Sequence, residues 1–176
     1  MATTNWVFDP AHSELQFKVK HLLISTVTGN FKEFNGSVTA GDNFDNAQIN
    51  FETSVDSLTT HNEQRDAHLK SPDFFESDRF PKLSFASTKF TRKGEDTYEL
   101  EGDLTIKGIT KPVTLAVDYN GTAQDPYGNT KAGFELNGKI NRKDFGLSWS
   151  ALTEAGGMVV SDEVKLLGNI QLLKQS

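Results

Sequence analysis

The sequence of 176 residues contains no cysteine. Without thiols the chain has no disulfide framework, cysteine nucleophile, iron–sulfur cluster or thiolate zinc site. Basic residues are also in the minority, with 18 Lys and Arg against 24 Asp and Glu, for a net charge of −6. Contacts to phosphate need clustered basic side chains, so the composition argues against nucleic acid as a partner.

Long apolar runs are absent as well. Leu22–Ile24 is among the longest uninterrupted ones, whereas a membrane-spanning helix needs about 20 apolar residues. Residues 1–9 lack the basic start and apolar core of a signal peptide. We therefore expect no transmembrane segment, and a cytoplasmic protein as the sequence is written, or a periplasmic one if a signal peptide preceded this numbering.

Phenylalanine is abundant, with 13 Phe against two Trp and three Tyr, which suggests a large interior that needs few hydrogen bonds. Apolar and polar residues alternate through much of the chain, which is typical of antiparallel strands with one buried face. The alternating segments are 14–20, 49–55, 98–106, 113–119, 132–140 and 164–172, and two more strands are expected at 31–40 and 83–90. Phe31 and Phe34 lie three apart, which indicates an irregularity such as a bulge in their strand.

Turn sequences separate these strands, at residues 92–96, 107–112 and 125–129, with Asn120-Gly121 opening the last loop. Strands joined in this way form a meander. We predict an all-β, eight-stranded antiparallel barrel that takes up residues 1–176 as a single domain. Inward positions include Gly102, Gly138 and Gly168, which fits close packing, tight curvature or room for a ligand.

One segment departs from the strand pattern. Thr60 to Glu63 fits a capping box and predicts a short helix at about 62–70. Pro72 suits the first position of a second short helix at about 72–76. A connection of this length either plugs one end of the barrel or contributes to function.

Polar side chains give few indications of catalysis. His61 and His68 are two helical turns apart, about 10.5 Å, too far to share a zinc ion. Asp9, His12 and Ser13 have the residue types of a nucleophilic triad, but no Gly-x-Ser-x-Gly motif accompanies them, and capping of a turn explains them more simply. Arg142 falls on the inward phase of its strand, which requires either a carboxylate partner or a polar ligand group.

Five ordered motifs resemble those of the YceI-like family. These are Trp6–Ser13, Gly29–Phe31 with Gly36, Arg65–Phe75 followed by Phe80-Pro81, Gly102–Thr110, and Asn141–Gly146. The resemblance covers essentially the whole chain. It implies a lipocalin-like barrel whose long internal pore binds an isoprenoid chain, often that of a quinone, or another amphiphilic lipid, and it suggests a homodimer.

Two functions remain open. In the first, the protein binds an elongated amphiphilic lipid (an isoprenoid quinone, a polyprenyl chain or a fatty-acid-like molecule) for storage or transport, without cofactor, metal or catalytic residue. In the second, it is a hydrolase or isomerase that uses His12, His21 or His68 inside the barrel. The absence of a catalytic motif favours the first.

The lipid-binding hypothesis predicts a set of wall residues. Most of them fall on the apolar side of their strand and are expected on the inner face of the barrel, and others are expected near a barrel end. His21 and Arg142 are expected to orient a head group. The predicted ligand-binding residues are Phe17, Val19, His21, Phe31, Phe51, Phe74, Phe75, Phe85, Leu100, Leu104, Phe134, Ile140, Arg142, Phe145, Trp149 and Leu166.

Overall fold

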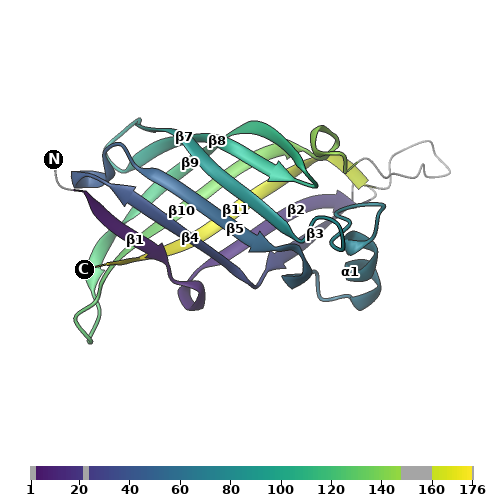
Figure 1. Cartoon of the computed structure of the whole chain (residues 1–176), viewed down its shortest axis with the longest axis horizontal. Helices are drawn as coiled ribbons and strands as arrows, with labels where there is room; N and C mark the ends of the chain where they lie inside the picture. Colours follow the sequence, from purple (N-terminus) through teal and green to yellow (C-terminus); the bar gives the residue numbers. More distant parts are fainter. Residues whose placement is uncertain (1–2, 22–23, 148–159, 176) are drawn as a thin grey trace.

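The computed structural model describes residues 3–21, 24–147 and 160–175. Eleven strands form one antiparallel sheet that closes on itself (Figure 1). Their bounds are β1 Thr4–Phe8, β2 Glu14–His21, β3 Ser25–Phe31, β4 Phe34–Ala40, β5 Gln48–Ser54, β6 Leu58–Thr59, β7 Lys82–Arg92, β8 Thr97–Ile106, β9 Ile109–Gln124, β10 Thr130–Asn141 and β11 Val160–Lys174. The helical elements are α1 Glu63–Lys70 and the 3-10 turns η1 Pro10–His12, η2 Asp42–Phe44, η3 Val55–Ser57 and η4 Arg142–Phe145.

The eleven strands occupy eight positions around the barrel. β1 and β2 are successive parts of one long strand, because both pair with β11 on either side of η1. In the same way β3 and β4 share the next position, because β3 pairs with β2 and β4 with β1. The position after that is shared by β5 and β6, because β5 pairs with β4 and β6 with β3. Pairing then continues in chain order from β7 to β11, so the predicted eight-stranded antiparallel meander is confirmed.

Turns and irregularities follow from local chemistry. The β8–β9 hairpin turns on Lys107 and Gly108 alone, both with positive φ (54° and 75°), as a two-residue turn of type I′ requires. The irregularity expected between Phe31 and Phe34 is present, because β3 ends at the first and β4 begins at the second. The prediction for Asn120-Gly121 was wrong: these residues form a bulge within β9 opposite Gly133, so the loop begins only at Asp125.

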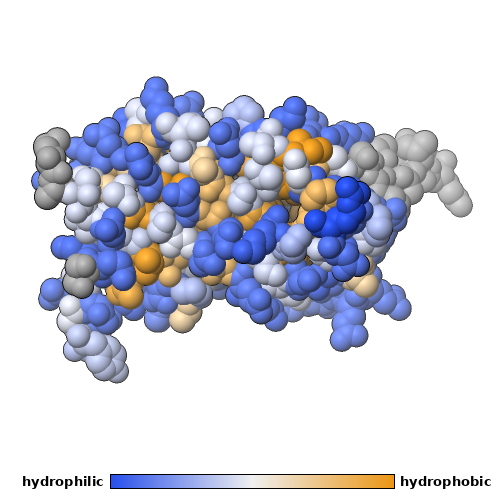
Figure 2. Space-filling view, viewed as in Figure 1, coloured by the Kyte–Doolittle hydropathy of each residue, from blue (hydrophilic) through white to orange (hydrophobic). Residues whose placement is uncertain are grey.

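Alternation along the strands separates core from surface. In β8 the residues Tyr98, Leu100, Leu104 and Ile106 are buried, and the intervening acidic residues are not. The face seen in Figure 2 is accordingly mostly hydrophilic, with hydrophobic residues showing between the polar ones. The barrel thus presents a nearly continuous apolar inner wall.

Inward glycines make room for neighbouring side chains. A Cβ atom on Gly102 would lie 2.4 Å from the ring of Phe85, and one on Gly138 would lie 2.4 Å from the side chain of Leu115. Gly29 is likewise covered by the ring of Phe17. Of the three explanations left open for the small residues, close packing against the wall applies at these positions.

Helix α1 and the segment after it lie across one end of the barrel (Figure 1). The helix predicted at 62–70 is confirmed, but its cap is Asn62, whose side chain accepts from Arg65 N, and not Thr60. The prediction of a second short helix at 72–76 was wrong. Phe75 N donates to the carbonyl of Leu69 and Glu76 N to that of Ser71, so the chain folds back on α1 as turns. Among the described residues, no helix is long and apolar enough to cross a bilayer.

Candidate functional site

Three cavities follow one another inside the barrel. The largest, about 210 Å³, lies at the α1 end. A second of about 110 Å³ shares Phe31, Leu83 and Leu166 with the first. A third of about 60 Å³ shares Ile49 and Leu100 with the second. The shared walls arrange the three cavities in a row along the barrel.

The walls of this row are apolar. Every residue lining the third cavity is hydrophobic, and the second adds only Gln16 to a hydrophobic lining. The first cavity is lined mainly by aliphatic and phenylalanine side chains from β2, β3, α1, β7, β10 and β11, together with a few nitrogen-bearing ones. Apart from Gln16 in the second cavity, the side chains that could hydrogen-bond to a polar guest line the first cavity, at the α1 end.

The structure brings together most of the predicted site residues. Those lining the first cavity are Phe17, Val19, His21, Phe31, Phe74, Phe75, Ile140, Arg142 and Leu166. Those lining the second or third are Phe31, Phe51, Phe85, Leu100, Leu104, Phe134 and Leu166. They come mainly from β2, β3, β5, β7, β8, β10 and β11 and from the segment after α1, so the wall is assembled from most of the chain. Their contact with a ligand stays a prediction.

One described residue of the predicted set is not on this wall. Phe145 in η4 is 1% exposed and lines none of the three cavities, so it packs in the core at the α1 end. Phe145 lies in a 3-10 turn and not in a strand, so the alternation of apolar and polar residues could not indicate which way its side chain points. Trp149 lies outside the described residues.

Sequence reasoning missed several lining residues. Arg65 and Leu69 of α1 both border the first cavity, and their spacing of four places them on one face of the helix. That spacing was available from the sequence, but the apolar content of the helix is too low to mark a buried face. The other lining residues not predicted include Lys20, Val27, Leu83, Ile106, Leu147, Val160 and Val164.

Arg142 is held by the protein itself. It is 2% exposed, and its Nε donates to Ser161 O at 2.9 Å, while the terminal nitrogens donate to Leu147 O and to Val160 O. The carboxylate oxygen Oδ1 of Asp162 lies 3.7 Å from Nη2 of Arg142. Burial lowers the pKa of Arg142 and Asp162 opposes that shift. Of the two roles left open, pairing within the protein is the observed one, mostly with backbone carbonyls and only partly with a carboxylate.

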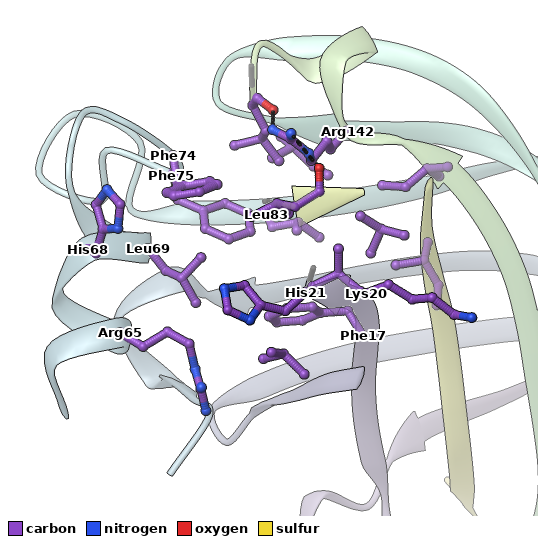
Figure 3. Close-up of a pocket in the computed structure, with 18 of the residues that line it drawn as sticks. Phe17, Lys20, His21, Arg65, His68, Leu69, Phe74, Phe75, Leu83 and Arg142 are labelled. Atoms are coloured by element: carbon purple, nitrogen blue, oxygen red, sulfur yellow. Dashed lines mark hydrogen bonds between the residues drawn. The ribbon is translucent and has the colours of Figure 1, made fainter. Parts of the chain in front are cut away.

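Three further polar groups of this cavity, His21, Arg65 and His68, lie on or beside α1 (Figure 3). His21 ends β2 and points its ring toward the helix, and within the described residues that ring has no hydrogen-bond or ion-pair partner. Arg65 donates to the hydroxyl and the carbonyl of Thr60 at 2.8 and 2.7 Å. His68 Nε2 lies 2.8 Å from a carboxylate oxygen of Asp73. Most polar groups along the row therefore lie at this end, and His21 is the one best available to recognise a polar part of a ligand.

The residues considered as a triad are not arranged as one. His12 Nδ1 lies 2.8 Å from Asp9 Oδ2, but the His12 side chain is 58% exposed and lines none of the three cavities. The hydroxyl of Ser13 bonds to the backbone of Gln171, both as donor and as acceptor. The capping role applies to Asp9, which accepts from Ala11 N.

The opposite end of the barrel is closed by aromatic rings. The Phe44 ring lies 5.3 Å from Trp6, 5.6 Å from Tyr119 and 5.0 Å from Phe134, measured between ring centroids. Trp6, Phe44 and Phe134 are 6–8% exposed. The row of cavities ends against this cluster, since Phe44 and Phe134 both line the third cavity.

No group of three or more potential metal ligands occurs within the part of the chain that the structure describes.

Comparisons with known proteins agree on one family. A family model described as a YceI-like domain matches residues 6–172. A UPF0312 protein of Staphylococcus aureus is 39% identical over 165 residues, which covers 92% of this chain and 93% of that protein. The crystal structure of a Campylobacter jejuni YceI protein matches with a TM-score of 0.76 and 31% identity over 89% of this chain and 90% of the other. A polyisoprenoid binding domain from Saccharophagus degradans shares the fold, with a TM-score of 0.70 and 14% identity over 97% and 98% of the two chains.

Proposed function

Because the chain belongs to the YceI-like family, we propose that it binds the chain of an elongated amphiphilic lipid inside the barrel and stores or transports it. The observation that carries this proposal is the row of three apolar cavities along the barrel. Isoprenoid quinones, polyprenyl chains and fatty-acid-like molecules all fit this description. A polyisoprenoid ligand is favoured by the shared fold with the polyisoprenoid binding domain from Saccharophagus degradans.

The length of the row suits a long chain. Phe134 at one end of the row and Ile140 at the other are six residues apart on β10, about 20 Å along the strand and about 15 Å along the barrel at a tilt of ~40°. A carbon–carbon bond of about 1.5 Å advances roughly 1.25 Å along an extended chain. The row thus matches about twelve bonds of a linear lipid.

The head group would lie at the α1 end. Polar side chains line the cavity there, and two of them, Lys20 and Arg65, are exposed to solvent. His21 would donate to or accept from the head group, whereas the apolar wall supplies most of the binding free energy at ~0.8 kcal/mol per buried CH₂. Affinity is then spread over many residues, and no single wall substitution abolishes it.

Organic extraction of the purified protein followed by mass spectrometry tests the proposal. We expect an amphiphilic lipid in the wild-type extract and less of it in Phe51→Ala, which removes a ring from the wall of the second cavity. His12→Ala is the control, because this exposed histidine does not border the row and should leave lipid content unchanged.

An enzyme would give the opposite pattern. A change at His21 or His68 would abolish turnover of a small substrate, while wall substitutions would only shift substrate preference. Absence of lipid from the wild-type extract, together with turnover of a small substrate that a His21 or His68 substitution abolishes, would overturn the binding proposal.

A further inference from the structure

We infer that Phe44 is the floor of the binding row and sets the greatest chain length that the protein accepts. The inference rests on the proposed lipid-binding function, but it concerns which lipids are selected. It is carried by the aromatic cluster that closes the barrel opposite α1, and by the order of the cavities.

The cavities narrow toward Phe44. Their volumes fall from about 210 to about 110 and about 60 Å³ from the α1 end onward, and Phe44 borders the last of them. A chain that enters beside α1 therefore meets this ring after it has passed the whole row. Trp6, Phe134 and Tyr119 pack on the ring at centroid distances of 5.3, 5.0 and 5.6 Å, which restricts its movement away from the row.

The backbone holds the ring in place against its own preference. Phe44 has φ of 61°, in the left-handed region that a bulky side chain rarely adopts. The turn around it is fixed by hydrogen bonds from Phe44 N to Gly41 O and from Gly41 N to Asp45 O, at 3.2 and 2.9 Å. Tyr98, on β8, donates its hydroxyl to Asn43 O at 3.0 Å and ties the turn to the barrel wall. Strain of this kind persists only where the surroundings impose it, so the inward position of the ring is built in.

Removal of the ring should deepen the row by one aromatic layer. Packed rings are separated by about 5 Å, which equals four carbon–carbon bonds of an extended chain at about 1.25 Å each. Four bonds correspond to one isoprene unit or four methylenes. Truncation at Phe44 should therefore lengthen the longest accepted chain by about this amount.

Linear primary alcohols of 10 to 20 carbons, in steps of two, measure the limit directly on protein stripped of copurified lipid. For wild type, affinity should rise about fourfold per added methylene and stop rising at one chain length, where the end of the chain reaches the floor. Phe44→Ala should move that break about four carbons higher. Phe44→Leu keeps more apolar volume and guards against loss of folding, and it should move the break in the same direction by a smaller step.

Phe74→Ala is the matched control. It removes a phenylalanine from the first cavity, at the α1 end, and it should lower affinity at every length without moving the break. A break at the wild-type length in both folded Phe44 variants would overturn the floor and leave lipid binding intact. Absence of any length-dependent binding in wild type would instead reject the proposed function on which the inference rests.

Discussion

The glycine at position 29 tests whether the barrel wall is built to keep its lumen open. Gly29 on β3 is directly paired with Phe17 on β2. A Cβ atom at Gly29 would lie 2.2 Å from Cζ and 2.3 Å from Cε1 of that ring. Nonbonded carbons prefer about 3.5–4.0 Å, so in Gly29→Ala the ring must move by roughly 1.5 Å. The first cavity, which Phe17 lines, is the space available to it.

We expect Gly29→Ala to lower the free energy of unfolding by about 1–3 kcal/mol, the usual cost of overpacking. It should also reduce the amount of copurified lipid, because the displaced ring takes up room in the cavity. Urea denaturation measures the first effect, and extraction with mass spectrometry measures the second. The double variant Gly29→Ala/Phe17→Leu should recover much of both, because the shorter side chain removes the clash.

Gly133→Ala is the matched control, also a glycine-to-alanine change within a strand. Its Cβ would meet only the Cβ of Asn120 at 3.7 Å, an ordinary contact. We expect it to be neutral or to stabilise the fold by about 0.4–1 kcal/mol through the unfolded chain. Equal stability and equal lipid content in the two alanine variants would refute the argument that glycine keeps the lumen open.

Three further predictions concern stability. Arg142→Met should lower the free energy of unfolding by about 1–3 kcal/mol in urea denaturation, since the carbonyls of Ser161, Leu147 and Val160 lose their donor; an unchanged free energy of unfolding would contradict this. Hydrogen bonds to His12 and then to Lys131 lower the pKa of Asp9 in the folded state. The stability that the Asp9 carboxylate contributes is therefore present above its pKa in the unfolded chain and is lost as the pH falls through its pKa in the folded protein. Asp9→Asn removes this contribution, so the free energy of unfolding should fall less steeply below about pH 4. The same pH dependence of the free energy of unfolding in Asp9→Asn and wild type would count against this prediction. Asn62→Ala should cost ~1 kcal/mol by removing the cap of α1, and thermal melting at wild-type temperature would show that the cap is dispensable.

The architecture could be predicted from sequence because strand alternation is a local property. Each of the eight expected segments, from 14–20 to 164–172, coincides with a strand or a pair of strands in the barrel. What the alternation could not show is that η1 divides the first long strand in two, with a three-residue shift in pairing to β11. Interruptions of this kind depend on which strand lies alongside, and that is a non-local property.

The site was harder to predict for the same reason. Strand phase correctly placed residues such as Phe17 and Phe51 on the inner wall, but phase carries no information on side chains outside strands. Phe44 was missed because it is held in a turn by tertiary contacts against its local backbone preference. Arg142 was expected to need a carboxylate or a ligand, whereas backbone carbonyls around η4 and β11 supply most of its partners.

The pairing of β11 has a consequence for synthesis of the chain. This strand, the last of the eleven, lies between β10 on one side and β1 and β2 on the other, so every stage before its emergence leaves two long strand edges unpaired. A ribosome-bound chain must therefore wait for residues 160–174 before the barrel can close, and pairing across 139 to 168 residues makes closure slow. During this interval the edges and the apolar wall are exposed to other nascent chains, and a factor that shields β10 until β11 has emerged would raise the yield of folded protein.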